Sequence, residues 1–517
     1  MSRSILTALA LTVCALRPLW CNCVAVAAES NEPSFSAPSP SADEGKNSSQ
    51  RPALSDREIR LAVENELLAS AAIKSHRLQV LVEDGIVTLA GRVRNLLDED
   101  IAVGLTQRVR GVVSVVDQLE VNGPYRPDAE LQQAVEAALD SDPATHILPV
   151  HVVVKDGIAT LDGEVAGYGA KTLASDIARS VVGLADVDDR MKVNLKFMPS
   201  DAELNKEIAE LLKYSVQLDQ VELDVVVKAG TAVLNGAVTT DFQRSVAEQL
   251  ALQAGAKDVD LRGIVVEWDL ANQELRASRY QKATDEEIRD AVTRALKYDP
   301  RVLSFHPEVE VKNGVVTLTG NVSNLAARRA AERAARFTVG VRQVNDHLNI
   351  NWSETTPTDE EISEYTIAAI HRDPYLHDEE IIVDCENAHI ELHGIVETNF
   401  EKNHAEWTAS RQRDVVHVDN YLVVRAKWIP KTDEAITADL KDRMELMFVN
   451  DQENVVTFKV SNGVAIMEGS VETWYLWQNV LDEAVAAGAR EPHMMIEVRS
   501  GTPASLRYSG PHDYVPQ

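Results

Sequence analysis

Cysteine is scarce in this sequence, with four among 517 residues. Three of them, Cys14, Cys21 and Cys23, lie in an N-terminal segment with the features of an export signal that is removed. Cys385 would then stand alone, so no intrachain disulfide is expected in the mature chain. An exported protein without such bridges must be held together by its packing.

Long apolar runs are missing beyond the first residues. Ile5 to Leu16 is a run of apolar and small residues. No later segment approaches the roughly 20 apolar residues that a membrane-spanning helix needs. We therefore expect any membrane contact to be peripheral rather than integral.

Positive charge is also in short supply. The chain has 51 lysines and arginines against 81 aspartates and glutamates, a formal net charge of −30. Such a chain repels nucleic-acid phosphate and is disfavoured at an anionic bilayer. We therefore expect no nucleic-acid partner, and any lipid contact has to come from a local patch.

The two ends of the chain are not expected to belong to the fold. Residues 1–28 begin with Arg3 and the apolar run and end in small residues such as Ala25-Val26-Ala27, the pattern of a secretory signal peptide. Residues 29–52 are rich in Ser, Pro, Asn and acidic residues, which predicts a disordered spacer. Residues 500–517 are expected to form a flexible tail.

One unit recurs between these ends. Its marker is a glycine that occurs six times with a period near 73 residues, lengthened by about eleven between the third and fourth copies, at Gly91, Gly163, Gly236, Gly320, Gly394 and Gly469. An aspartate stands 35 residues before each glycine, or 36 in the last copy: Asp56, Asp128, Asp201, Asp285, Asp359 and Asp433. These coincident landmarks predict six copies of one small fold.

Each copy is expected to run helix, strand, strand, helix, strand. The two strands meet at the residue pairs Asp84-Gly85, Asp156-Gly157, Ala229-Gly230, Asn313-Gly314, Asn387-Ala388 and Asn462-Gly463. Asp-Gly and Asn-Gly predict a two-residue hairpin, because both turn positions need positive φ. The landmark glycine follows inside the second strand, where it indicates a bulge or a close backbone approach, such as that of the crossing helix. We interpret the six glycines as fold-determining rather than catalytic.

This order predicts an α+β fold: a tandem array of six small αββαβ two-layer domains, each a three-stranded mixed sheet with two helices on one face. The six domains are expected at residues 53–122, 123–197, 198–268, 284–352, 353–428 and 429–499. Residues 269–283 are expected to be a linker or a helical extension.

The fourth copy resembles the BON domain, named for bacterial osmotically inducible and nodulation proteins. The similarity lies in Asp285-Glu-Glu-Ile, in Val311-Lys-Asn-Gly-Val-Val-Thr-Leu-Thr-Gly-Asn-Val and in Val339-Gly-Val-Arg-Gln-Val-Asn. It extends over nearly all of residues 53–499. The resemblance implies export to the periplasm or outer envelope, phospholipid binding, support of envelope integrity under osmotic stress, and chaperone-like contacts. It implies no catalytic residues.

Motifs for catalysis are absent from the sequence. There is no nucleophile elbow, no His-Glu-x-x-His and no phosphate-binding loop. We therefore expect no enzyme activity and no cofactor.

Histidine is concentrated in repeat five. In His389-Ile-Glu-Leu-His393, strand alternation places His389, Glu391 and His393 on one face. Two imidazoles and a carboxylate are ligands for zinc or copper. The same pattern also fits a pH-responsive interface or the solvated face of an edge strand.

Two further stretches are candidate contacts for lipid or a partner. The second helix of repeat six opens with Trp474, Tyr475 and Trp477, whose rings suit a lipid interface or a partner pocket. The second helix of repeat four has a basic stretch formed by Arg328, Arg329, Arg333 and Arg336. For the aromatic residues the alternative is that the rings pack within the fold. For the arginines it is that they form a solvated helix face.

The favoured function is a non-catalytic, exported binding or scaffold protein of the bacterial envelope that contacts phospholipid or envelope surfaces. A chaperone-like or adaptor role toward proteins is the alternative, and a metal-responsive role is a third.

Overall fold

The computed structural model describes residues 54–70, 72–73, 78–195, 199–270, 273–303, 305–350, 357–424, 431–448, 454–471, 474–489 and 492–499. These residues belong to one unit by their contacts, Ala53–Gln517. The predicted signal peptide, spacer and tail lie outside the described residues.

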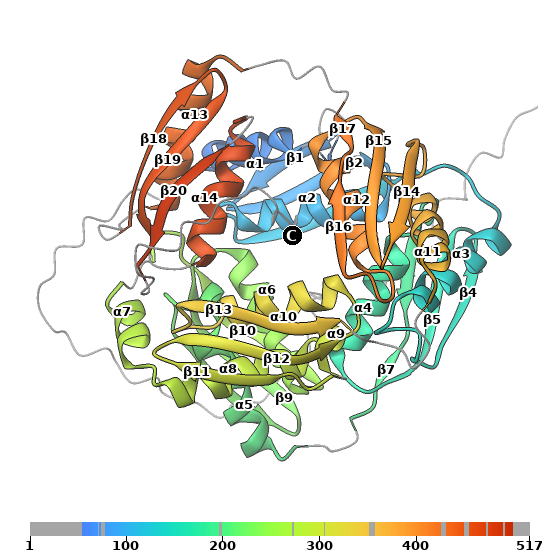
Figure 1. The fold of residues 1–517 in the computed structure, drawn as a ribbon. Coiled ribbons are helices and arrows are strands. Elements are labelled where there is room, and N and C mark those ends of the chain that lie inside the picture. The colour runs from blue at the N-terminus through green and yellow to red at the C-terminus, as the bar shows by residue number, and fades with distance from the viewer. Residues whose placement is uncertain are drawn as a thin grey trace, which may run out of the picture. The chain divides into compact units, whose positions relative to one another are not determined.

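The first three repeats share one order of elements (Figure 1). Repeat one comprises α1 (Asp56–Ala69), β1 (Leu78–Glu83), β2 (Ile86–Val93), α2 (Leu96–Arg108) and β3 (Ser114–Val121). Repeat two comprises α3 (Asp128–Ser141), β4 (Val150–Lys155), β5 (Ile158–Val165), α4 (Tyr168–Arg179), β6 (Asp186–Asp189) and β7 (Lys192–Val193). Repeat three comprises α5 (Asp201–Tyr214), the 3₁₀ turn η2 (Val216–Leu218), β8 (Leu223–Lys228), β9 (Thr231–Val238), α6 (Asp241–Ala254) and β10 (Asp258–Val266).

The last three repeats keep that order. Repeat four comprises α8 (Asp285–Tyr298), α9 (Pro300–Leu303), β11 (Glu308–Lys312), β12 (Val315–Val322), α10 (Leu325–Arg336) and β13 (Gln343–Ile350). Repeat five comprises α11 (Asp359–Arg372), β14 (Ile381–Glu386), β15 (His389–Val396), α12 (Asn399–Ser410), β16 (His417–Asn420) and β17 (Val423–Val424). Repeat six comprises α13 (Asp433–Met447), β18 (Val455–Ser461), β19 (Val464–Val471), α14 (Trp474–Ala486) and β20 (His493–Val498). A separate helix, α7 (Gln273–Lys282), lies within the predicted linker.

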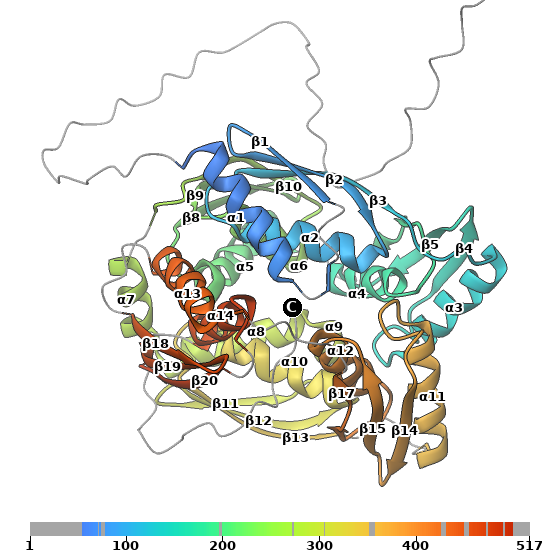
Figure 2. The same ribbon diagram turned by 90° about the horizontal axis from the view of Figure 1, so that it is seen from above.

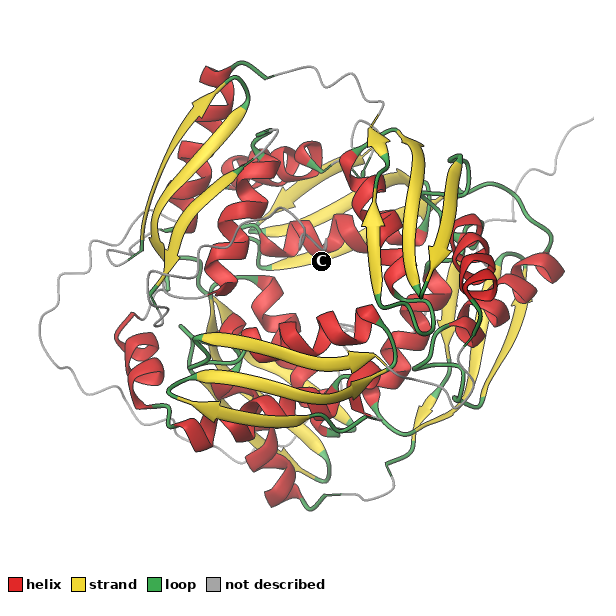
Figure 3. Ribbon diagram, viewed as in Figure 1, coloured by secondary structure: helices red, strands yellow, loops and turns green. Residues whose placement is uncertain are grey.

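Each repeat contains one mixed sheet, which confirms the predicted fold class. The second strand is central: it pairs antiparallel with the first strand and parallel with the last, as β12 does with β11 and β13. In repeats two and five the last strand is divided in two, so that β6 and β7 both pair with β5. The two helices cover one face of the sheet and leave the other uncovered by their own unit (Figures 2 and 3).

The hairpin turns have the predicted conformation. Both turn residues have positive φ in every copy, for example 53° at Asn313 and 74° at Gly314. Even Ala388 adopts a φ of 61°. A left-handed alanine is strained, so the fold imposes this turn in repeat five against local preference.

The landmark aspartates accept hydrogen bonds from the backbone of these turns. In repeat four, Thr284 caps α8 through a capping box with Glu287. The next residue, Asp285, accepts hydrogen bonds from the backbone N–H groups of Asn313 at 2.7 Å and Gly314 at 2.8 Å. The other five aspartates accept the same two bonds in their own repeats. The recurring Asp therefore joins the first helix to the hairpin.

The landmark glycines have φ between 121° and 154°. At Gly394 a Cβ would overlap the carbonyl oxygen of Glu380, and at Gly236 it would lie 2.5 Å from that of Glu222. The approaching group is thus the backbone just before the first strand, rather than the crossing helix suggested as an example.

Each repeat has its own apolar core between the helices and the sheet. In repeat four it includes Ile288 and Val292 of α8, Val316 and Leu318 of β12, and Ala331 of α10. Contacts between elements of different repeats are chiefly helix to helix, as between α2 and α6, α5 and α8, α3 and α11, and α10 and α12. The sheet faces that the helices leave uncovered carry exposed side chains such as Leu81 and Val153.

Candidate interaction surfaces

Buried polar contacts join repeats that are far apart in sequence. The hydroxyl of Tyr375 in repeat five donates to Asp98 of repeat one at 2.8 Å, and both side chains are buried. Arg411 of repeat five pairs with buried Asp142 of repeat two at 3.1 Å. Because such groups are costly to leave unpaired, these contacts fix neighbouring repeats against one another.

Carboxyl groups at these contacts are shifted toward their neutral form. Arg179 of α4 pairs with Asp100 of α2 at 2.6 Å and lies 3.9 Å from Glu99. Burial, with a hydrogen bond to Asp117, raises the pKa of Glu99 to about 8. Burial, with the nearby charge of Asp100, raises the pKa of Asp176 to about 6. We therefore expect the contact between repeats one and two to respond to pH.

Arg443 of α13 forms a similar buried cluster. It lies 2.7 Å from Glu66 of repeat one and 2.6 Å from Glu483 of α14. Burial and the charge of Glu483 raise the pKa of Glu66 to about 7. This cluster links repeat six to repeat one.

Two cavities among the described residues are small. One lies between repeats two and five, beside Asp142 and Arg411, and holds about 40 Å³. A second, beside Leu212 and Arg279, is of the same size. Small-molecule sites occupy roughly 300–1,000 Å³, so these two cavities have room for water rather than for a substrate.

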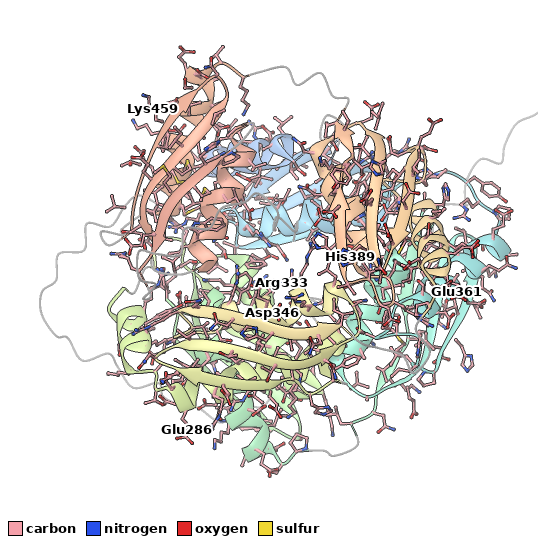
Figure 4. The ribbon with its side chains drawn as sticks, in the orientation of Figure 1. Glu286, Arg333, Asp346, Glu361, His389 and Lys459 are labelled. Carbon is pink, nitrogen blue, oxygen red and sulfur yellow. The ribbon has the colours of Figure 1, made fainter. Side chains whose placement is uncertain are left out.

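The four predicted arginines of α10 are half-buried. Arg328 pairs with Asp346 at 2.6 Å, Arg329 with Glu406 of repeat five at 2.8 Å, and Arg336 with Glu332 at 2.5 Å. Burial and the nearby Arg301 lower the pKa of Arg333 to about 10. Figure 4 labels Arg333 and Asp346. The arginines of α10 thus form ion pairs within repeat four and one ion pair with repeat five.

The predicted aromatic cluster is only partly described. The Trp477 ring is partly buried against the core of repeat six. Trp474 and Tyr475 belong to α14, and their side chains lie outside the described residues.

The predicted histidines alternate along β15 with buried Ile390 and Leu392, so they lie on the uncovered sheet face of repeat five; Figure 4 labels His389. His389 and Glu391 are exposed, and His393 lies 3.2 Å from the carboxylate of Glu391. The contact between two histidines is a different one: His389 pairs in register with His417 of β16, and their ring centroids are 5.5 Å apart. Among the described side chains, no three His, Cys, Asp or Glu residues converge as ligands of one ion.

Exposed aliphatic side chains on the first three sheets were not singled out from the sequence. Leu81 is 62 % exposed, Val153 60 % and Val226 47 %. Each stands at the same register position, opposite Thr88, Thr160 and Val233 of its central strand. The signal was available, because strand alternation places these residues opposite the core-facing side chains.

The same position is charged in the other three repeats. It is occupied by Glu310, Asp384 and Lys459, all exposed; Figure 4 labels Lys459. Further exposed aliphatic residues accompany the first set: Ile86, Val116, Ile158 and Val265. At this one register position the uncovered faces of repeats one to three are therefore aliphatic and those of repeats four to six charged. Elsewhere on the sheets of repeats five and six, Ile382, Val455 and Met495 are exposed as well.

Comparison with known proteins identifies the fold. Five segments match the BON domain, at residues 55–123, 127–194, 200–267, 284–351 and 358–426. The chain belongs to the BON domain family. The matched BON segments correspond to repeats one to five, and repeat six has the same order of elements.

One relative is the osmotically-inducible protein Y of Escherichia coli (strain K12). It is 29 % identical over 146 residues, which cover 27 % of this chain and 73 % of that protein. Two solved structures of CdsD, a structural protein of the type III secretion system of Chlamydia trachomatis, are also similar. The first, of the C-terminal domain, is 20 % identical and covers 41 % of this chain and 100 % of that chain, with a TM-score of 0.12. The second is 19 % identical, covers 43 % of this chain and 98 % of that chain, and also has a TM-score of 0.12. At this TM-score the likeness to CdsD supports no functional argument.

None of the helices in the described part of the chain combines the length and apolar content that crossing a bilayer requires.

Proposed function

We propose that this BON-domain array is a non-catalytic binding or scaffold protein of the bacterial cell envelope that contacts phospholipid during osmotic stress. The contact surface is the outer sheet face of repeats one to three. The observation that carries this proposal is the exposed aliphatic residue shared by those three sheets: Leu81, Val153 and Val226. The name of the osmotically inducible relative supports the stress context, and the predicted signal peptide supports export.

The energetics favour several weak contacts acting together. Burying one Leu or Val side chain is worth roughly 1.5–3 kcal/mol before the costs of binding. Three linked modules can gain about 10² to 10⁴ in avidity when they engage one surface together. Because the chain has a net charge of −30, zwitterionic headgroups suit it better than anionic ones. The fitting ligand is therefore a neutral phospholipid surface.

The same faces also suit a second function. Exposed aliphatic patches can bind apolar segments of unfolded proteins, as a chaperone or adaptor does. This alternative predicts suppression of client aggregation without association with vesicles.

Vesicle flotation tests the proposal. The mature chain is mixed with vesicles of phosphatidylcholine alone or with added phosphatidylglycerol, at two salt concentrations. We expect flotation with neutral vesicles, weaker flotation with anionic vesicles at low salt, and partial recovery at high salt as repulsion is screened. No flotation under any condition would overturn lipid binding, and suppressed aggregation of an unfolded client in that case would favour the alternative.

Matched variants locate the surface. A triple variant with Leu81→Gln, Val153→Gln and Val226→Gln should lose flotation. The control changes the same register position in the other repeats, with Glu310→Gln, Asp384→Asn and Lys459→Gln, and should float as the parent does. Loss of flotation on changing Arg328 or Trp477, with the first triple unaffected, would instead place the contact on α10 or α14.

A further inference from the structure

Among the strands that the structure describes, only β15 and β16 of repeat five place two histidines in register with one another. His389 begins β15, and His417 begins the neighbouring parallel strand β16 in direct register with it. Both side chains are exposed. On the other side of β15, exposed Glu386 is the antiparallel partner of His389. Two imidazoles and a carboxylate thus lie side by side on three paired strands.

We infer that His389 and His417 form a two-histidine site for a borderline divalent transition metal, zinc or copper, on the sheet of repeat five. This inference is independent of the proposed lipid contact. It also differs from the sequence-based grouping of His389 with Glu391 and His393, because the second imidazole comes from another strand.

The ring separation fits one shared ion. A metal–nitrogen bond of about 2.0–2.1 Å places each imidazole centroid roughly 3.2 Å from the ion, so two rings at a tetrahedral angle have centroids roughly 5.2 Å apart. The observed centroid separation of His389 and His417 is 5.5 Å. The spacing of the two rings is therefore compatible with one shared ion.

The surroundings favour metal binding by these two rings. Asp419 lies 3.2 Å from Nε2 of His417 and can orient that ring when the other nitrogen binds. The adjoining turn is fixed, since the Val416 N–H donates to the carbonyl oxygen of Ala388 at 3.0 Å. Imidazole ligands select zinc, copper or nickel over magnesium or calcium. With two protein ligands from histidine, water completes the coordination, so the bound ion remains open to exchange.

Isothermal titration of the untagged full chain with zinc alone, and separately with copper alone, tests the inference. We expect one saturable site that is weakened at least tenfold in His389→Asn and in His417→Asn. His393→Asn should leave it unchanged, which separates the cross-strand pair from a site along β15. The control is His151→Asn, an exposed histidine on the sheet of repeat two that pairs with Asp162.

The copper-loaded chain gives a second measurement. Its electron paramagnetic resonance spectrum should show two imidazole nitrogens, and one after either substitution at position 389 or 417. Circular dichroism confirms that each variant is folded. Absence of saturable binding of either ion, equal weakening by His151→Asn, or loss of binding in His393→Asn would overturn the inference.

Discussion

Asp285 accepts a hydrogen bond from the backbone N–H of Gly314, 29 residues further on, with 2.8 Å between Oδ1 and N. The bond joins the first turn of α8 to the hairpin between β11 and β12, and its counterpart occurs in all six repeats. The recurring aspartate is thus explained by structure rather than by chemistry on a ligand.

Replacing Asp285 should make repeat four less stable in a pH-dependent manner. Hydrogen bonds from Gly314 and Asn313 lower the pKa of Asp285. A carboxyl with a lowered folded-state pKa stabilises the fold above its unfolded-state pKa, about 3.9, and loses that contribution as the pH falls through the folded value. Asp285→Asn should therefore lower the unfolding midpoint at neutral pH and differ less from the parent below about pH 4.

Thermal unfolding over a pH series measures this effect. Glu286→Gln is the control, because Glu286 is an exposed neighbour whose ion pair with Arg289 spans 3.5 Å. A constant difference between Asp285→Asn and the parent at every pH would show that the carboxylate charge has no part in the bond.

The landmark glycines should not tolerate a side chain. Gly394 has a φ of 139°, and a Cβ there would overlap the carbonyl oxygen of Glu380. Gly394→Ala should cost roughly 1–3 kcal/mol from backbone conformation alone, with the overlap adding to it. Gly104→Ala, in α2 with open space around it, should instead stabilise by about 0.5–1 kcal/mol. Urea unfolding of both variants checks the pair, and equal effects would contradict the assigned role of Gly394.

The hairpin of repeat five should gain stability from glycine. Ala388 has a φ of 61° where four of the other repeats have Asp-Gly or Asn-Gly turns and repeat three has Ala-Gly. Relief of a left-handed alanine is worth about 1–2 kcal/mol, of which the added freedom of the unfolded chain removes about 0.4–1 kcal/mol. Ala388→Gly should thus stabilise by up to about 1 kcal/mol in urea unfolding. A destabilised variant would show that the turn is unstrained.

The contact between repeats one and two should weaken as the pH rises. Burial raises the pKa of Glu99 to about 8. A group with a raised folded-state pKa contributes its full stability below the unfolded value, and that contribution is lost as the pH rises through the folded value. Glu99→Gln should therefore match the parent near pH 5 and be more stable than the parent near pH 9. Unfolding midpoints across this range test it, and a variant less stable at both ends would show that the Glu99 charge is favourable beside Arg179.

The sequence was sufficient for the fold because its signals are local. Asn313-Gly314 determines a turn and Gly320 marks a strand at fixed spacing, so element order and sheet type followed from residues near one another in the chain. The division of the last strand into β6 and β7, and of its counterpart into β16 and β17, has no comparable local signal.

The surfaces were harder to predict, because they depend on partners distant in sequence. The Arg329 side chain reaches Glu406 of another repeat, and His389 meets His417 rather than a residue of its own strand. A basic stretch or a pair of histidines can be found in the sequence, but the residue that each side chain contacts cannot. The exposure of Leu81 was predictable from strand alternation. That the same register position is aliphatic in repeat one and charged in repeat four becomes evident only when Leu81 is compared with Glu310.

The central claim is that the outer faces of repeats one to three meet the lipid. A polarity-sensitive fluorophore attached to Leu81→Cys, Val153→Cys or Val226→Cys, each in a Cys385→Ala background of the mature chain, tests it most directly. The matched control carries the fluorophore at Glu310→Cys, the same position in repeat four. With phosphatidylcholine vesicles we predict a blue shift at the first three positions and none at 310. A shift at 310 alone, or at none of the four in a chain that floats with the vesicles, would contradict the account.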